Sequence, residues 1–222
     1  EIWLNSHFLH WWLLPSLHAH PSWLPHLLPD SIDPLPTAGS AFHGALHQYW
    51  SSQLLAKKTV DTTQLTAITI HPALALCIVP SALFDRWLQH AGILMASTPL
   101  RRCIDRASRE HAQQALGDQA LVWAIHTAPH LYPGPPNITA LEWHGLDLAE
   151  SMRWLGAQLL WTALEDAPFA LRERVLWQLP MHWDAFEKPS TRWPSASEAQ
   201  AVCLKLINTL DSAWLSSLPK TH

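Results

Sequence analysis

Prolines interrupt the beginning of this chain at short intervals and limit the structure that can form there. Six of them lie within the first forty residues, at Pro15, Pro21, Pro25, Pro29, Pro34 and Pro36. Each proline lacks a backbone N–H donor and disfavours the helical conformation in the preceding residue, so no long helix can run through this stretch. We expect an extended N-terminal segment that apolar side chains, among them Trp11, Trp12 and Trp23, attach to the rest of the protein.

After residue 40, apolar residues recur at helical spacing. The apolar residues of the stretch from Ala41 toward Lys58 share one face, which predicts a helix, and Ser40 is placed to cap it. The same reasoning predicts helices over 81–95, after Thr98–Pro99, between Ser108 and Gly117, from Asp118, over 145–166, over 168–180 and from a cap at Ser195 or Ser197 through Trp214. The predicted fold class is all-α: an irregular array of short and medium helices with a proline-rich N-terminal segment and little or no β structure.

The length of 222 residues fits one large domain or two small ones, and we expect residues 1–222 to form a single helical domain. The strongest helix-breaking run is Pro129–Pro136, so residues 129–137 are the candidate position for a break between subdomains. No internal repeat and no low-complexity tract is present in the sequence.

One stretch without charged residues, Thr62–Phe84, is long enough to span a membrane. It contains Gln64, His71, Pro72 and Pro80, which argue against a spanning helix. We expect a buried strand-like or loop segment followed by a helix, and no direct membrane insertion.

Two features bear on the cellular compartment. The apolar stretch Ile2–Leu14 lacks a basic leader and does not fit a secretory signal. The three cysteines, Cys77, Cys103 and Cys203, are odd in number and widely spaced, which favours free thiols in a reducing compartment over a disulfide framework.

The charge balance and the missing motifs exclude several classes of function. With 14 Lys plus Arg against 18 Asp plus Glu, the net charge of -4 argues against a nucleic-acid partner. Only 7 glycines are present, and no glycine-rich phosphate loop or nucleophile-elbow motif occurs. We therefore expect no cofactor, no small-molecule substrate and no enzymatic activity.

Histidines and one cysteine invite a metal or catalytic interpretation. Pairs and triplets of the 15 histidines recur at short spacing, as in His7/His10, His18/His20/His26 and His43/His47. A zinc site needs a third and usually a fourth ligand, and no HExxH or paired CxxC motif supplies them, so we predict no metal. Cys103 with Glu110 and His111 lacks a motif that would orient a nucleophile and its base, and we assign it no catalytic role.

Four arginines lie within nine residues, at Arg101, Arg102, Arg106 and Arg109. If this stretch is helical, three of them recur at i, i+4 and i+7 on one face. The stripe is either a solvated face paired with Asp105 and Glu110, or a docking surface for an acidic partner, because guanidinium groups bind carboxylates in a bidentate fashion.

Tryptophan is unusually abundant, with 14 residues in the chain. One core of this size normally uses fewer, so some rings are expected to meet a partner, unless tryptophan simply replaces Leu or Phe. Trp11, Trp12 and Trp23 in the N-terminal segment are the candidates, either for partner binding or for attaching the segment to the core.

The order of several segments resembles the SctK family, the YscK/PscK-like proteins of bacterial type III secretion systems. The densest likeness lies in Ala91–Arg106 (AGILMASTPLRRCIDR), Ala115–Leu121 (ALGDQAL) and Trp123–Ile125, and weaker likeness lies in Trp23–Pro25, Trp177–Pro180 and Ala201–Ile207. Ala91–Met95 departs from the apolar pattern of the family by starting with Ala-Gly.

The resemblance implies a non-catalytic cytoplasmic adaptor at the inner-membrane base of the injectisome. Proteins of this family link the cytoplasmic domain of the ring protein SctD to SctQ in the sorting platform. A helical binding module or a secretion chaperone outside the platform is the alternative, and an unrecognised enzyme is a third hypothesis.

Overall fold

Helices make up all the regular structure of the part of the chain that the computed structural model describes. It describes residues 6–27, 41–56, 68–69, 71–103, 105–134, 147–183 and 193–217. None of these residues forms a strand. The predicted all-α class is therefore confirmed.

The chain forms two compact units, each assembled from separate stretches of sequence. Unit 1 comprises Glu1–Pro80, Ala167–Ala185 and Pro219–His222, and unit 2 comprises Ser81–Asp166 and Phe186–Leu218. The candidate break at residues 129–137 lies within unit 2, and its residues 135–137 fall outside the described residues.

Unit 1 begins with three short helical elements that the prolines separate. They are α1 (Ser6–Leu13) and the 3-10 helices η1 (Pro15–Leu17) and η2 (Pro21–Leu27). The prediction of an extended segment is wrong here, because proline is tolerated at the first position of a helix, where its missing N–H has no intrahelical partner to lose. Pro15 and Pro21 begin the two 3-10 helices, and none of the three elements described between residues 6 and 27 is longer than eight residues.

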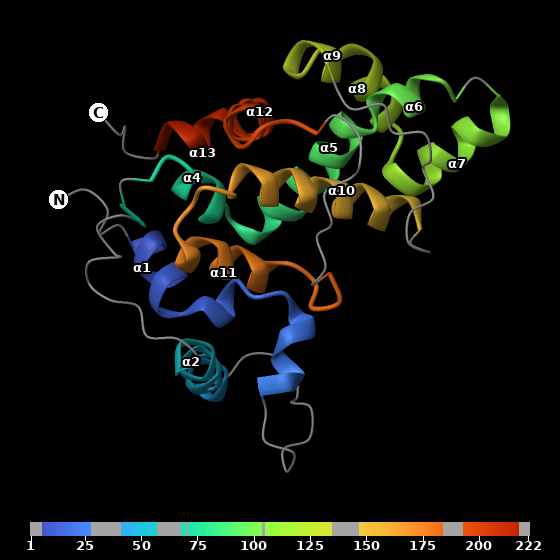
Figure 1. The fold of residues 1–222 in the computed structure, drawn as a ribbon. Helices are drawn as coiled ribbons and strands as arrows, with labels where there is room; N and C mark the ends of the chain where they lie inside the picture. Colours follow the sequence, from blue (N-terminus) through green and yellow to red (C-terminus); the bar gives the residue numbers. More distant parts are fainter. Residues whose placement is uncertain are drawn as a thin grey trace. The chain divides into compact units, whose positions relative to one another are not determined.

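The other helices of unit 1 are α2 (Ala41–Ala56), α4 (Leu74–Cys77) and α11 (Phe169–Gln178). α2 packs against η1 and η2, and α11 packs against α4 (Figure 1). Ser16 joins η1 to α2, since its Oγ lies 2.9 Å from His47 Nδ1 and 2.8 Å from Ser51 Oγ. Both serines are buried, so these hydrogen bonds satisfy polar groups that water does not reach.

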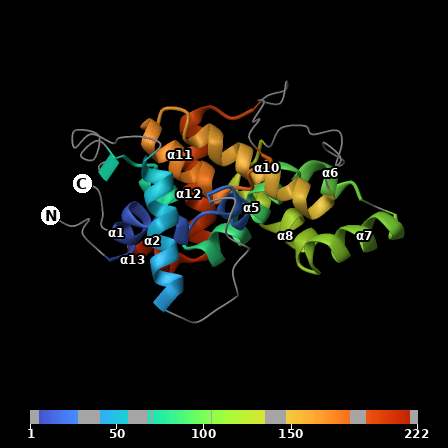
Figure 2. The ribbon, with the colours of Figure 1, turned by 90° about the horizontal axis from the view of Figure 1, so that it is seen from below.

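Unit 2 is built around α5 (Ser81–Met95) and α10 (Leu148–Ala163), which lie side by side (Figure 2). α12 (Ala196–Leu210) packs against both, and α13 (Ser212–Ser217) follows it. Four shorter helices continue from the end of α5: α6 (Ser97–Arg101), α7 (Arg106–Leu116), α8 (Ala120–His126) and α9 (Ala128–Leu131). α8 is the common neighbour of this group, because it contacts α5, α6, α7 and α9.

Side-chain caps decide where the C-terminal helices begin and end. Of the two predicted caps, Ser195 and Ser197, it is Ser195 that caps α12, and Glu198 completes a capping box by accepting a hydrogen bond from Ser195 N. The predicted continuous helix through Trp214 is wrong, because α12 ends at Leu210. Asp211 then starts a new helix, and its carboxylate accepts a hydrogen bond from Trp214 N at 2.9 Å.

Two glycines allow α5 and α10 to approach each other backbone to backbone. A Cβ on Gly92 would overlap the carbonyl oxygen of Met152, and a Cβ on Gly156 would overlap the carbonyl oxygen of Leu88. The two contacts are reciprocal, since Leu88 and Gly92 are one turn apart on α5, as Met152 and Gly156 are on α10. Any larger residue at either glycine must push the helices apart.

The uncharged stretch Thr62–Phe84 is described only in part. Residues 62–67 and 70, which belong to the predicted strand-like or loop segment, lie outside the described residues. The predicted helix after it is confirmed, since α5 begins at Ser81. Among the described residues, no helix combines the length and the apolar character needed to cross a membrane.

We predict that Gly156→Ala destabilises unit 2 by about 3 kcal/mol or more, because backbone carbonyls cannot move aside as side chains do. Gly44→Ala is the matched control, since α2 offers open space around Gly44 and alanine favours helices over glycine by roughly 0.5–1 kcal/mol. Thermal and urea unfolding followed by circular dichroism measures both changes. Equal unfolding midpoints for Gly156→Ala and the parent chain would contradict the tight crossing.

Candidate interaction surfaces

The four arginines singled out in the sequence lie in unit 2, on two helices. Arg101 ends α6 and Arg102 follows it as the C-cap, whereas Arg106 begins α7 and Arg109 lies about one turn further along. The stretch is not one continuous helix, so the predicted i, i+4, i+7 stripe does not form as such. We refer to these four side chains as the arginine surface.

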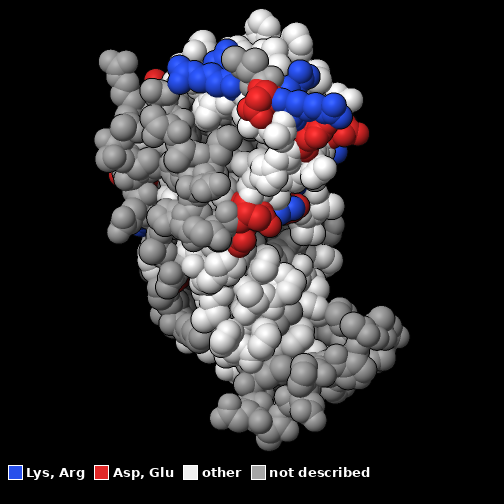
Figure 3. Space-filling model, turned by 90° about the vertical axis from the view of Figure 1, so that its right-hand side faces the viewer, with Lys and Arg blue, Asp and Glu red and all other residues white. Residues whose placement is uncertain are grey.

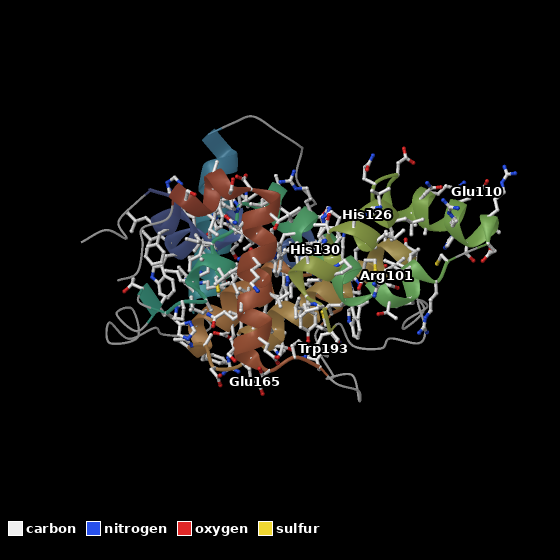
Figure 4. The ribbon with its side chains drawn as sticks, turned by 90° about the horizontal axis from the view of Figure 1, so that it is seen from above. Arg101, Glu110, His126, His130, Glu165 and Trp193 are labelled. Carbon is white, nitrogen blue, oxygen red and sulfur yellow. The ribbon has the colours of Figure 1, made fainter. Side chains whose placement is uncertain are left out.

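All four arginines are exposed. Arg106 donates from Nε to Glu110 Oε1 at 2.6 Å, and its side chain remains 91% exposed. Arg101 donates from Nε to the Ser97 carbonyl oxygen at 3.3 Å. The other two form no ion pair with any described residue. Figure 3 shows basic side chains with acidic ones between them, and Figure 4 shows Arg101 on α6 and Glu110 on α7.

Asp105 lies between the two pairs of arginines and determines where α7 begins. Its carboxylate accepts a hydrogen bond from Ser108 N at 2.8 Å, so the helix starts at Arg106 and not at the predicted Ser108. The hydrogen bonds from Ser108 lower the pKa of Asp105. With Asp105 and Glu110, residues 101–110 carry four positive and two negative side chains.

The tryptophans of α1 pack inside unit 1. Trp11 is 1% exposed, and its ring centroid lies 6.1 Å from that of Phe8. Trp12 is half-buried, and the Arg174 guanidinium carbon lies 4.8 Å from the Trp12 ring and 5.0 Å from the Trp177 ring. Burial lowers the pKa of Arg174 to about 10, so the guanidinium is still charged at neutral pH. The cation–π contact of Arg174 with Trp12 thus joins α11 to α1.

Trp23 attaches η2 to the residues that follow α11. Its ring is half-buried, and Nε1 donates to the Leu179 carbonyl oxygen at 2.8 Å. Nearby, His20 N donates to the Trp177 carbonyl oxygen at 2.7 Å. Trp12 and Trp23 therefore contact other parts of unit 1, and Trp11 is buried in it. A role of these tryptophans in partner binding stays a prediction.

Several large apolar side chains that the structure leaves exposed were not singled out in the sequence. Among the described residues they are Leu13, Leu17, Tyr49 and Phe169 in unit 1, and Val122 and Ile125 in unit 2. Val122 and Ile125 are 50% and 47% exposed and lie one turn apart on α8. In the sequence, the run Leu121–Ile125 is apolar on every side of the helix, although only one side can be buried. This excess of apolar residues is the signal that predicts exposed apolar side chains on α8.

The environment of Cys103 does not favour a nucleophilic thiolate. Burial and the neighbouring Asp105 carboxylate raise the pKa of the thiol, and Sγ donates to the Pro99 carbonyl oxygen at 3.6 Å. Reactive cysteines have the opposite surroundings, which lower the pKa. Within the described ranges, no three His, Cys, Asp or Glu side chains are grouped so that they could hold a metal ion.

We predict that Trp11→Ala destabilises the protein by about 3–5 kcal/mol, as expected for removal of a large buried ring. Leu13→Ala on the same helix is the matched control, because Leu13 is 55% exposed and its truncation should change stability by less than about 0.5 kcal/mol. Urea unfolding of the purified variants compares them. If Trp11→Ala unfolds like the parent chain, the ring is not part of the core.

Alkylation should distinguish the three cysteines. Cys77 and Cys203 are fully buried and burial raises the pKa of both thiols, whereas Cys103 is partly exposed. We expect iodoacetamide to modify Cys103 in the folded protein and the other two only in denaturant. Mass spectrometry of the peptides reads out the result, and modification of Cys77 or Cys203 without denaturant would contradict the described core.

One of the comparisons with known proteins identifies a family. A family model described as "YOP proteins translocation protein K (YscK)" matches residues 4–216, which include parts of both units. Neither the curated proteins nor the solved structures include a significant match. The chain therefore belongs to the YscK family and is a type III secretion protein.

Proposed function

We propose that this chain is a non-catalytic adaptor of the type III secretion sorting platform that links the cytoplasmic domain of SctD to SctQ. The observation that carries the proposal is the family match over residues 4–216, together with the resemblance of Ala91–Ile125 to proteins with that role. In this proposal the chain acts in the cytoplasm, at the inner-membrane base of the injectisome, and its partners are proteins.

The described parts of the two units differ in their charged side chains, which supports an adaptor with two different partners. In the described part of unit 1, the only Lys, Arg, Asp or Glu residues are Arg172, Glu173 and Arg174, and Arg174 is buried. Its exposed apolar side chains include Leu13 and Leu17. Unit 2 carries the exposed arginine surface. An adaptor needs separate docking surfaces, and surfaces of different chemistry select different partners.

The side-chain chemistry also supports a binding role over catalysis. Burial raises the pKa of all three cysteines, which works against thiolate formation. The buried Arg174 guanidinium makes cation–π contacts with the Trp12 and Trp177 rings. A binding protein needs no activated nucleophile, and it benefits from a fixed surface on packed helices.

The proposal predicts that the purified full chain binds the SctD cytoplasmic domain and SctQ at the same time. In a pull-down with tagged SctD domain, SctQ should be retained only when the chain is present. Deletion of the gene should abolish export of secreted substrates, and a plasmid copy should restore it.

The controls separate the alternatives. SctD domain and SctQ mixed without the chain report any direct contact between them. A chain that binds neither protein would rule out the adaptor function. Binding to an exported effector instead of the platform proteins would favour a secretion chaperone.

A further inference from the structure

We infer that the arginine surface docks an acidic segment of a protein partner, in which carboxylates are separated by neutral residues. This inference depends on the proposed adaptor function, because it assigns one of the two docking surfaces. The surface lies in unit 2, at the junction of α6 and α7.

The composition of the surface favours carboxylate recognition. All four cations are arginine, although the chain also contains lysine. A guanidinium presents a planar fork that binds a carboxylate through two parallel hydrogen bonds, whereas a lysine ammonium acts as a point charge. Arg102 and Arg109 are exposed, and no acidic side chain among the described residues pairs with their guanidinium groups.

The backbone that carries these arginines is fixed at both sides of the junction. Arg102 N donates to the Pro99 carbonyl oxygen at 3.0 Å, which closes the last turn of α6. Asp105 caps α7 through Ser108 N. The buried residues of α7 are only Ala112 and Leu116, so the turns that carry Arg106 and Arg109 face solvent. A preorganised surface loses less conformational entropy on binding.

The two acidic residues among the arginines, Asp105 and Glu110, determine which spacing of carboxylates in the partner can bind. Asp105 is exposed, and an exposed aspartate carboxylate is ionised at neutral pH. Glu110 accepts a hydrogen bond from Arg106 Nε at 2.6 Å. A continuous run of carboxylates would be repelled at these two positions, whereas spaced carboxylates can reach Arg102 and Arg109. Like charges brought together at an interface cost affinity, so the acids contribute selectivity.

The same features argue against an anionic membrane as the ligand. Membrane-binding basic clusters combine about 4–8 cations with little opposing charge, or add a large apolar face that enters the lipid. Here two acids offset half of the four arginines, and the exposed residues of α7 include no large apolar side chain. A protein segment with separate carboxylates therefore fits the surface better than the phosphate groups of an anionic lipid bilayer.

The test uses single charge reversals in the full chain. Arg102→Glu and Arg109→Glu should each weaken binding to one platform protein, either the SctD cytoplasmic domain or SctQ, and the double variant should weaken it about tenfold or more. Binding to the other protein should be unchanged. Lys205→Glu is the matched control, because Lys205 is exposed on α12 and the substitution changes the net charge by the same amount.

Two further variants and one probe complete the design. Arg102→Lys/Arg109→Lys keeps the charge and removes the guanidinium groups. The affinity of this variant for the platform protein should therefore lie between the affinities of the parent chain and the double reversal. Affinity should also fall with added salt in the parent chain and less so in the double reversal. Sedimentation with vesicles of phosphatidylcholine and phosphatidylglycerol tests whether the chain binds an anionic membrane. Circular dichroism checks that each variant is folded.

The outcomes separate this inference from the proposed function. If the parent chain binds both platform proteins and folded Arg102→Glu/Arg109→Glu binds them equally well, the inference fails and the adaptor function stands. If the parent chain binds neither protein, both fail. Arginine-dependent sedimentation with the vesicles, without a loss of protein binding in the reversals, would assign the surface to the membrane and overturn the inference.

Discussion

The reciprocal contact between α5 and α10 is the constraint on which the rest of unit 2 depends. Gly92 and Gly156 bring the two backbones together, and α12 closes over them, where Trp87 Nε1 donates to the Cys203 carbonyl oxygen at 3.4 Å. Because α6, α7, α8 and α9 continue from the buried end of α5, their positions follow from this crossing. The arginine surface is thus placed by packing that involves none of its own residues.

Unit 1 consists in part of short helical elements bounded by prolines, and side-chain contacts hold these elements in place. These contacts are made by large aromatic rings and by hydrogen bonds to backbone carbonyls, such as the one that Trp23 Nε1 donates to the Leu179 carbonyl oxygen. The Arg174 guanidinium between two indole rings is the one buried arginine among the described residues, and cation–π contact compensates in part for its desolvation. The abundance of tryptophan therefore has a structural use in this unit.

Helical periodicity predicted much of the fold correctly, because each long helix keeps one buried face. The range expected for α5 was right, and Ser195 was correctly identified as a cap. Two of the errors lie where one polar side chain outweighs periodicity. Asp105 and Asp211 each start a new helix by accepting a backbone N–H, and the apolar pattern does not register such a local hydrogen bond.

The sequence by itself determined the all-α class, the family and the clustering of four arginines, because these depend only on residue type and spacing. The tertiary structure decided which of the singled-out residues face solvent: Trp11 is buried, whereas the arginines are exposed on two helices. It also decided the role of Gly92 and Gly156. The physical reason is that burial and close backbone approach arise from residues distant in sequence, whose meeting no local pattern encodes.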